Sequence, residues 1–416
     1  MESNLIHILI FFPFLLLAGC ATTKDVESIK QEAEQLHNEI ISIDTHTDTP
    51  LKLLQKDFDI RKSHNAQEDQ SKVDFPRMKE GRLDAVFFAA FIGQGPRTKS
   101  GNEEAKLKVL SIIDTIHSVI KKNSDLAEVA LNASDAEKIK SKGKLAIYIG
   151  IENGYALGND LSMIKKYYDL GARYITLCHT KNNDLCDSST DPDSVNTYKG
   201  LSELGKKAVE EMNSIGMMID VSHISDKAFY DVINYTKVPV IASHSCARAI
   251  CNNPRNMDDA MLRKLAENGG VIQMCILSEY VKDPPANPGR DSAMSVFRNK
   301  YPGYEALTDE QKAKMRSERN EIDKKFPRLL ANVSDVADHI DHIVSVAGID
   351  HVGIGTDFDG GGGVNGCFDI SEMKNITVEL LKRGYSHSDI KKIWGGNFLR
   401  VFRQVEHYAQ MAHAKN

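Results

Sequence analysis

The sequence predicts a single (β/α)8 barrel, an α/β fold of the TIM type in which eight parallel strands alternate with helices. Three observations predict it. The chain contains eight short apolar runs rich in β-branched or aromatic residues, amphipathic stretches separate them, and six of the runs end in a His, Asp or Glu. Buried parallel strands have this composition. An alternation repeated eight times favours one barrel over two separate domains.

The predicted strands can be placed from these runs. They occupy residues 41–48, 85–92, 145–152, 174–179, 217–223, 240–244, 270–276 and 352–357. Between strands, apolar residues recur at helical spacing, and the expected helices are 106–121, 161–170, 201–214 and 333–347. After the eighth strand, 370–382 and 388–405 should form the closing helices. The sequence therefore predicts one barrel domain over residues 39–410.

One long segment departs from the alternation. About 75 residues separate the seventh and eighth strands, far more than a usual connection. The segment starts with a proline-rich stretch at 283–289 and continues with a charged helical stretch at 308–325. We expect an insertion at about 278–332 that lies over the mouth of the barrel. A peripheral flap without substrate contact is the alternative.

The N-terminus is expected to be a targeting segment. Residues 5–17 are apolar, and this run is too short to span a membrane, which needs about 20 residues. It is typical of the h-region of a secretory signal. It ends in Leu-Ala-Gly-Cys at 17–20, which resembles a bacterial lipobox. We therefore expect a signal peptide at 1–19, acylation of Cys20, and a polar lipidated tether or first surface helix at 20–38. An ordinary signal peptide is the alternative, and residues 1–7 lack the usual Lys or Arg.

The charge balance, the residue after Cys20 and the cysteines bear on partners and localisation. The 52 Lys+Arg and 58 Asp+Glu residues are mixed, so no basic surface for nucleic acid is expected. Ala21 does not resemble the Asp signal for inner-membrane retention, so the outer membrane of a bacterial envelope is favoured. Export would permit disulfides. The six cysteines after Cys20 show no spacing that assigns pairs.

Six predicted strands end in groups that bind metals or move protons. In a (β/α)8 barrel the carboxyl ends of all strands meet at one mouth, where active sites form. One such group at one strand end is common, but six at the same mouth is a specific signal. The residues are His46 and Asp48, Glu152, His179, His223, His244 and Asp357.

Their types and spacing favour metal binding. His46 and Asp48 are two apart on a strand, so both side chains point to one face and can reach one cation. Glu152 ends a buried strand, where a carboxylate is costly unless it is paired or bound to metal. Its two oxygens could bridge two cations, and a buried ion pair is the alternative. His223 and His244 on adjacent strands complete a set of N and O ligands. This set suits Zn²⁺ in an open catalytic site, although Mn²⁺, Fe²⁺ or Co²⁺ would also fit.

Two further residues could act on a substrate. Asp357 could be a ligand or could handle the proton of a metal-bound water. Arg255 follows the sixth strand and could hold a carboxylate bidentately, with a surface salt bridge as the alternative. The glycines at 360–363 lack the GK[ST] ending of a P-loop and indicate a flexible turn.

These motifs resemble those of the membrane (renal) dipeptidase family, peptidase family M19. They occur in family order over nearly the whole mature chain, and as a set they are highly specific. Thr47 stands where the family usually has Asn, and Asn153 where Gly is common. The matching segments are 43–48 (IDTHTD), 150–154 (GIENG), 220–223 (DVSH), 242–245 (ASHS), 254–259 (PRNMDD), 336–343 (VADHIDHI) and 355–360 (GTDFDG).

The resemblance implies a metal-dependent hydrolase with two Zn²⁺ per subunit. Glu152 would bridge the ions, one held by His46 and Asp48 and the other by His223 and His244. A hydroxide between the metals would attack the peptide carbonyl of a dipeptide. His179 would stabilise the oxyanion, Arg255 would bind the substrate carboxylate, and Asp357 would transfer the proton. The resemblance also suggests L-D dipeptides, β-lactams and a homodimer.

Two other functions are weighed against this one. Another metal-dependent amidohydrolase, acting on a cyclic amide or as a deaminase, usually starts with His-x-His on the first strand and often bridges its metals with a modified Lys. This chain has His46-x-Asp48 and Glu152 instead. A non-catalytic peptide-binding lipoprotein should have lost ligands, and all the candidate residues are present.

Overall fold

The barrel predicted from the sequence is confirmed in the computed structural model, which describes residues 25–414 except 69, 194–196 and 302–306. All neighbouring barrel strands pair in parallel, in the order β1-β2-β4-β5-β6-β7-β8-β9. The barrel closes beyond the last strand, where Asp48 N–H donates to the Phe358 carbonyl at 2.8 Å and Asp357 N–H to the His46 carbonyl at 3.0 Å. The strands are β1 Ile43–Thr47, β2 Ala85–Phe91, β4 Leu145–Glu152, β5 Ala172–Thr176, β6 Met218–Asp220, β7 Ile241–Ser245, β8 Val271–Met274 and β9 Val352–Ile354.

Most strands are shorter at the mouth than the sequence predicts. Only β4 has the predicted bounds. β5, β6 and β9 end early, so that His179, His223 and Asp357 lie in the loops that follow these strands. The short strand β3 (Ala127–Val129) was not predicted, and it pairs with β4 outside the barrel.

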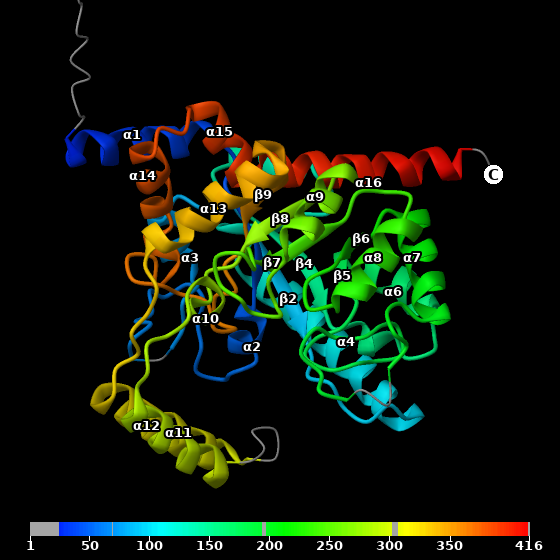
Figure 1. Cartoon of the computed structure of the whole chain (residues 1–416), viewed down its shortest axis with the longest axis horizontal. Coiled ribbons are helices and arrows are strands. Elements are labelled where there is room, and N and C mark those ends of the chain that lie inside the picture. Colours follow the sequence, from blue (N-terminus) through cyan, green and yellow to red (C-terminus); the bar gives the residue numbers. More distant parts are fainter. Residues whose placement is uncertain (1–24, 69, 194–196, 302–306, 415–416) are drawn as a thin grey trace, which may run out of the picture.

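Helices cover the outside of the barrel (Figure 1). α13 has the predicted bounds, whereas α4 begins seven residues earlier than predicted and α16 extends past residue 405. A π-turn at Lys392–Gly396 leads into α16. The covering helices are α2 Thr49–Leu53, α3 Phe75–Glu80, α4 Lys99–Lys122, α5 Asp135–Ser141, α6 Ser162–Asp169, α7 Glu203–Ile215, α8 Asp226–Tyr235, α9 Asp259–Glu267, α13 Val333–Ala347, α14 Lys374–Lys382, α15 His387–Lys391 and α16 Asn397–His413.

The amino end of the barrel is filled by large apolar side chains. Phe87 on β2 stacks on Tyr148 and Tyr174, with ring centroids 4.7 and 5.2 Å away. From α16, Phe398 meets Phe87 edge-on at 5.2 Å, and Phe402 lies 5.9 Å from Tyr148. All five rings are fully buried. The amino end is therefore a closed core, and the carboxyl end of the strands is where a site can form.

The segment after the predicted signal forms a packed surface helix where the structure describes it. α1 (Val26–Glu39) is capped by Asp25 and buries Ile29 and Ala33 against Val378 of α14. The predicted signal peptide and Cys20 lie outside the described residues. Among the residues that are described, no helix is both long and apolar enough to cross a membrane. The six described cysteines are free and buried.

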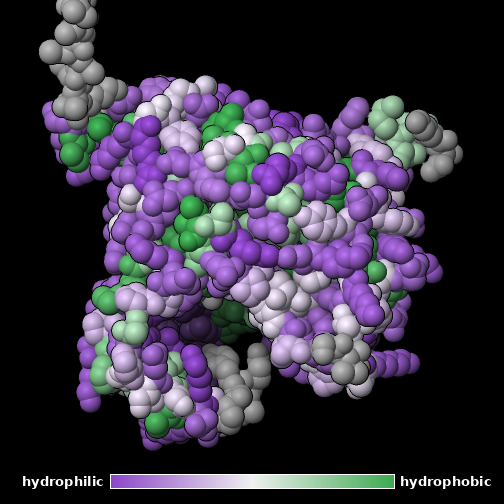
Figure 2. Space-filling view, viewed as in Figure 1, coloured by the Kyte–Doolittle hydropathy of each residue, from purple (hydrophilic) through white to green (hydrophobic). Residues whose placement is uncertain are grey.

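The insertion forms a helical arm. α10 (Ser278–Val281) remains with the barrel, while α11 (Pro288–Lys300) and α12 (Asp309–Lys325) project from the side on which α2 and α10 follow the strands (Figure 1). Arg290 closes the base of the arm by binding Asp323 and the Phe326 carbonyl. Figure 2 shows a hollow between the arm and the rest of the molecule. The arm thus stands beside the carboxyl end of the barrel.

Candidate metal centre

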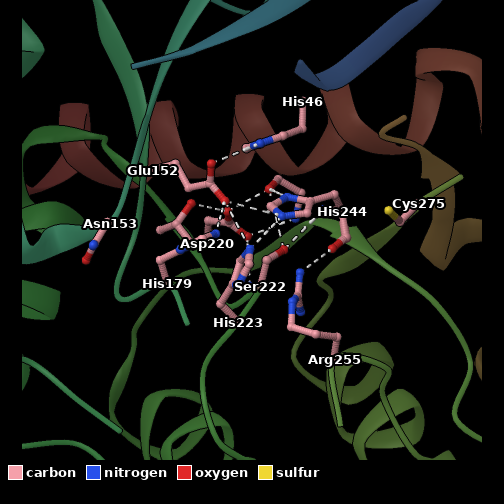
Figure 3. Close-up of polar contacts among 12 residues, drawn as sticks. His46, Glu152, Asn153, His179, Asp220, Ser222, His223, His244, Arg255 and Cys275 are labelled. Atoms are coloured by element: carbon pink, nitrogen blue, oxygen red, sulfur yellow. Dashed lines mark hydrogen bonds and ion pairs between the residues drawn. The ribbon is translucent and has the colours of Figure 1, made fainter. Parts of the chain in front are cut away.

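Four histidines surround one buried carboxylate at the mouth of the barrel (Figure 3). Glu152 Oε1 lies 3.0 Å from His223 Nε2, 3.5 Å from His244 Nε2 and 3.8 Å from His179 Nε2. Its other oxygen, Oε2, lies 3.3 Å from His46 Nε2. The two carboxylate oxygens therefore face different sets of nitrogen atoms, and five separate strands or loops contribute to one centre.

A second carboxylate group adjoins the first. Single donor atoms of His46, Asp48 and Asp357 lie within 4.8 Å of one another, and His46 is shared with the group around Glu152. Asp48 and Asp357 are buried. The structure thus brings together every residue that the sequence predicts as a metal ligand.

The orientation of His244 follows from its hydrogen bonds. The Ser243 hydroxyl donates to Asp220 at 2.6 Å, because a carboxylate only accepts. The same hydroxyl must then accept from His244 Nδ1, which lies 2.8 Å away. His244 therefore carries its proton on Nδ1 and points a bare Nε2 toward Glu152. Hydrogen bonds of this kind fix metal-binding histidines in proteins.

Several buried atoms at the centre lack a hydrogen-bond partner among the described residues. They include His46 Nε2 and Asp48 Oδ1. The Nε2 atoms of His223 and His244 lie 2.9 Å apart, although His244 Nε2 has no proton to share. Unsatisfied buried atoms are costly. Cations would satisfy these nitrogen and oxygen atoms together, so the residues present fit a metal centre of the open, catalytic kind.

Electrostatics agree with this interpretation. Burial and, to a lesser extent, the nearby Asp220 raise the pKa of Glu152 to about 8. Burial likewise raises the pKa of Asp357 to about 7 and raises that of Asp48. Burial lowers the pKa of His223 and His244, which keeps both imidazoles neutral, the form that binds metal. A bound cation would reverse the shift of the carboxyl groups, because it favours their ionised form.

Left-handed backbone conformations gather at this mouth. Asn153, His223, Asp357 and Asp359 have φ of +89°, +71°, +60° and +65°. Such conformations are uncommon outside glycine and cluster at functional sites. Asn153 stands where the family commonly has Gly, and Asn tolerates this conformation because its side chain bonds locally. Here its Oδ1 accepts from Tyr155 N–H at 3.1 Å.

His179 and Arg255 flank the cluster. The His179 side chain is 20% exposed, and its ring lies 4.7 Å from Phe91 and 4.3 Å from His223. Burial, aided by Arg255, lowers the pKa of His179 to about 3. Arg255 is buried and donates from Nη2 to the His244 carbonyl at 3.1 Å, while its Nε has no partner among the described residues. A guanidinium with a free donor beside the centre can take a carboxylate.

The sequence reasoning missed the carboxylates that support the ligands. Asp220 accepts from the backbone N–H groups of Ser222 and Ser243, at 3.0 and 2.8 Å, and so joins the loop that bears His223 to strand β7, which bears His244. Asp44 accepts from Thr356 N–H at 2.8 Å and joins β1 to the segment after β9. Both lie inside the apolar runs that the sequence predicts as strands. An ionisable residue in such a position needs buried donors, and this signal could have identified them.

The comparisons with known proteins agree with this geometry. The model of the membrane dipeptidase family (peptidase family M19) matches residues 30–416. Dipeptidase 3 of Macaca fascicularis is 32% identical over 399 residues, which cover 95% of this chain and 71% of that protein. Dipeptidase aclJ of Aspergillus oryzae is 32% identical over 344 residues, covering 82% and 71%.

Solved structures give the same fold. The crystal structure of the probable dipeptidase PvdM from Pseudomonas aeruginosa has a TM-score of 0.79 and 31% identity, and the match covers 92% of this chain and 100% of that one. A metallo peptidase from Rhodobacter sphaeroides, liganded with a phosphinate mimic of L-Ala-D-Ala, has a TM-score of 0.70 and 21% identity, covering 88% and 99%. The second likeness is one of fold. Together with the family match over nearly the whole chain, these findings favour a peptidase over the other two functions considered. The chain belongs to the membrane dipeptidase family, and it is a metal-dependent dipeptidase that hydrolyses peptide bonds.

Proposed function

We propose that this protein cleaves dipeptides with two zinc ions held on either side of Glu152. The observation that carries the proposal is the position of the Glu152 carboxylate, whose Oε2 faces His46 while its Oε1 faces His223 and His244. His46 and Asp48 would hold one ion, and His223 and His244 the other. When bound, the two ions would lower the pKa of a shared water to give hydroxide and would polarise the substrate carbonyl.

His179 would stabilise the charge that develops on the carbonyl oxygen. Its pKa of about 3 keeps the imidazole neutral at neutral pH, so that one ring nitrogen carries a hydrogen to donate. The ring borders both Glu152 and His223. A donor fixed beside the reacting carbonyl favours the transition state over the bound substrate.

Asp357 would carry the proton of the reaction. Its carboxyl group is buried within reach of His46 and Asp48, and burial raises its pKa to about 7. A group with a pKa near the working pH can accept a proton from the attacking water and return it to the leaving amine. We therefore assign Asp357 the role of general base and then general acid.

Arg255 would limit the substrate to two residues. Its guanidinium is buried beside His244 and retains a free Nε donor. Because Arg255 contacts the His244 backbone, a terminal carboxylate bound there would lie near the cleaved bond, as the carboxylate of a dipeptide does. The mimic bound to the Rhodobacter sphaeroides relative is that of an L-D dipeptide. It supports extending the proposal to dipeptides with a D-residue in the second position.

The proposal includes a site of action at a membrane. The sequence 17–20 and Cys20 resemble a lipobox, and α1 leads from this end of the chain onto the barrel. We propose a lipid-anchored enzyme of a bacterial envelope, in the outer membrane, that acts as a homodimer. Labelling with a fatty-acid analogue should mark the wild-type chain and should not mark a Cys20→Ala variant.

Hydrolysis of a dipeptide panel tests the proposed activity. L-L and L-D dipeptides should be cleaved, tripeptides and a β-lactam serving as comparison substrates. A chelator should abolish cleavage and zinc should restore it, with two zinc ions per chain by elemental analysis. Folded, zinc-loaded protein that cleaves no dipeptide would exclude the proposal.

A further inference from the structure

A glycine turn closes over the carboxylate side of the metal centre. A Cβ at Gly360 would lie 2.1 Å from Asp48 Oδ2 and 2.3 Å from Asp357 Oδ1, and one at Gly362 would lie 2.0 Å from the Thr356 carbonyl oxygen. No real side chain approaches so closely, so the backbone of the turn itself packs on the two carboxylates. The turn at 360–363 therefore acts as a wall of the site, and its placement sets the space around Asp357.

The same turn holds Asp357 in its left-handed conformation. The Asp357 carbonyl accepts three backbone hydrogen bonds, from Gly360 at 3.2 Å, Gly361 at 3.1 Å and Gly362 at 2.7 Å. Asp357 has φ of +60°, which a side chain disfavours. Because such a conformation persists only where its surroundings impose it, Asp357 depends on the turn for its orientation.

Lys72 binds this turn through its side chain and its backbone. Its ammonium donates to the Gly362 carbonyl and lies 4.2 Å from the centre of the Phe368 ring. Its backbone N–H donates to Asp359 Oδ1 at 2.7 Å, and its carbonyl accepts from Ile370 N–H at 3.0 Å. The lysine thus binds the segment after β9 before, within and after the glycine turn. A half-buried cation with a carbonyl and an aromatic face as partners is held in place by both.

We infer that Lys72 is a positioning residue for Asp357, which it orients through the glycine turn without touching the substrate. The inference rests on the proposed role of Asp357. Removing the ammonium should loosen the turn and let Asp357 leave the geometry that proton transfer needs. Small displacements of this kind lower kcat far more than they change substrate binding. Of the proposed metal ligands, only Asp48 packs against the glycine turn. The other ligands lie on other strands and loops, so the variant should keep its metal.

The main test compares two substitutions of the same lysine. Lys72→Met keeps most of the unbranched side chain and removes its charge and its donated hydrogen bond. We expect kcat to fall by about 10-fold or more with KM changed by less than about 3-fold. Lys72→Arg keeps a cationic donor and should recover most of the lost kcat. A Lys72→Met variant with the kcat of the wild type would overturn the inference, and so would a raised KM at unchanged kcat, which would indicate substrate contact.

Lys140→Met is a matched control at the opposite end of the barrel. Lys140 Nζ lies 2.9 Å from Asp84 Oδ2 and 2.5 Å from the Ile40 carbonyl, just before β2 and β1. The same chemical change there should lower the melting temperature and leave kcat unaltered. An equal loss of kcat in both variants would show a general loss of stability and would overturn the inference.

Hydrogen exchange gives a readout that needs no activity. Amides of 360–362 should exchange faster in Lys72→Met, because they donate to Asp357, and should be unaffected in Lys140→Met. If the wild-type protein cleaves no dipeptide, the proposed function fails. Faster exchange in Lys72→Met than in that wild type would still support the positioning role. If Lys72→Met does not fold, Phe368→Leu removes the aromatic partner alone. It should produce the same exchange change with a smaller fall in kcat, and unaltered exchange there would refute the inference.

Discussion

The two ends of the barrel differ in the side chains that they bury, which are apolar at the amino end and polar at the carboxyl end. At the amino end, Phe87, Tyr148 and Phe402 are fully buried and pack ring against ring. At the carboxyl end, His46 Nε2 and Asp48 Oδ1 are buried without partners among the described residues. The apolar rings at the amino end are stabilised by packing alone, whereas the buried polar atoms at the carboxyl end fit a bound cation.

Tyr174 joins the two ends. Its ring stacks on Phe87 in the closed apolar core of the amino end, while its hydroxyl lies 2.9 Å from His46 Nδ1. A ligand of the centre is thus oriented by a side chain anchored in the rigid core. The amino end therefore supplies stability and fixed geometry, whereas the carboxyl end carries unsatisfied groups that stability alone would not favour. Substitutions at the two ends should therefore have separable effects.

Glu152→Gln should have the largest effect at the carboxyl end. An amide keeps one oxygen acceptor but cannot face cations on both sides, so kcat/KM should fall by roughly 10³-fold or more. Zinc content should fall below that of the wild type. The metal-free variant should melt no lower than the metal-free wild type, because the substitution removes a buried carboxylate that faces Asp220.

Glu128→Gln is the matched control for this prediction. Glu128 on β3 pairs with Lys142 and Lys144 at 2.7 Å each, outside the barrel. Its zinc content and kcat/KM should equal those of the wild type. Retention of both metals and full activity by Glu152→Gln would remove the central role of this carboxylate.

This asymmetry also explains what the sequence could predict. β4 was placed with its observed bounds because an unbroken apolar run ends abruptly at Glu152, so burial and chemistry change at one residue. α13 was placed equally well because its apolar period is unbroken. The ligands were found because each follows an apolar run, and the geometry of a barrel brings strand ends together.

The rest could not be read from local pattern. β6 ends at Asp220, short of His223, because His223 turns into a left-handed loop that periodicity does not reveal. The contact between Tyr174 and His46 joins positions 128 apart, and the bond between Asp44 and Thr356 joins positions 312 apart. Such contacts depend on how strands pair across the barrel. The sequence also could not predict that α11 and α12 project as an arm. Their charged residues predict helices exposed to solvent, but not the direction in which these helices point.

Phe402→Ala should have the largest effect at the amino end. Phe402 is fully buried against Tyr148 and Phe398. Truncating a core aromatic residue costs about 3–5 kcal/mol of unfolding free energy. Below its melting temperature the variant should retain wild-type kcat and zinc content.

The control is Tyr408→Ala on the same helix, where the side chain is 38% exposed. It should change the unfolding free energy by less than about 1 kcal/mol. A fall in kcat for folded Phe402→Ala would show that the aromatic core at the amino end affects the metal centre. The effects of substitutions at the two ends would then not be separable.

Arg255→Met should weaken recognition without removing metal. A guanidinium with a free buried donor beside the centre is expected to bind the terminal carboxylate, so KM for dipeptides should rise by about 100-fold. Dipeptide amides lack that carboxylate, so they should be poor substrates of the wild type and lose little more in the variant. Arg248→Met in the same loop is the control, because Arg248 pairs with Asp226 at 2.6 Å. Equal losses for acids and amides would mean that Arg255 supports the fold around His244 and does not bind the substrate.

The smallest predicted effect is a pH dependence of stability that arises at the amino end. His37 on α1 is buried, with Nε2 2.7 Å from Thr377 Oγ1 and its ring against Trp394. Burial lowers the pKa of His37 to about 4, below the value of about 6.5 in an unfolded chain. The unfolded state therefore binds the proton first as the pH falls. The stabilising contribution is complete above about pH 6.5 and is lost as the pH falls toward 4.

Denaturant unfolding at pH 8 and pH 5 measures this contribution. The wild type should lose about 2 kcal/mol more than His37→Gln over this interval, because Gln has no proton to gain. Both proteins must carry the same zinc content, since zinc binding at the carboxyl end also weakens with acid. Parallel losses in the two proteins would assign the whole acid sensitivity to the metal centre. A steeper loss in the wild type would show that the apolar end has its own titration, separate from the chemistry at the mouth.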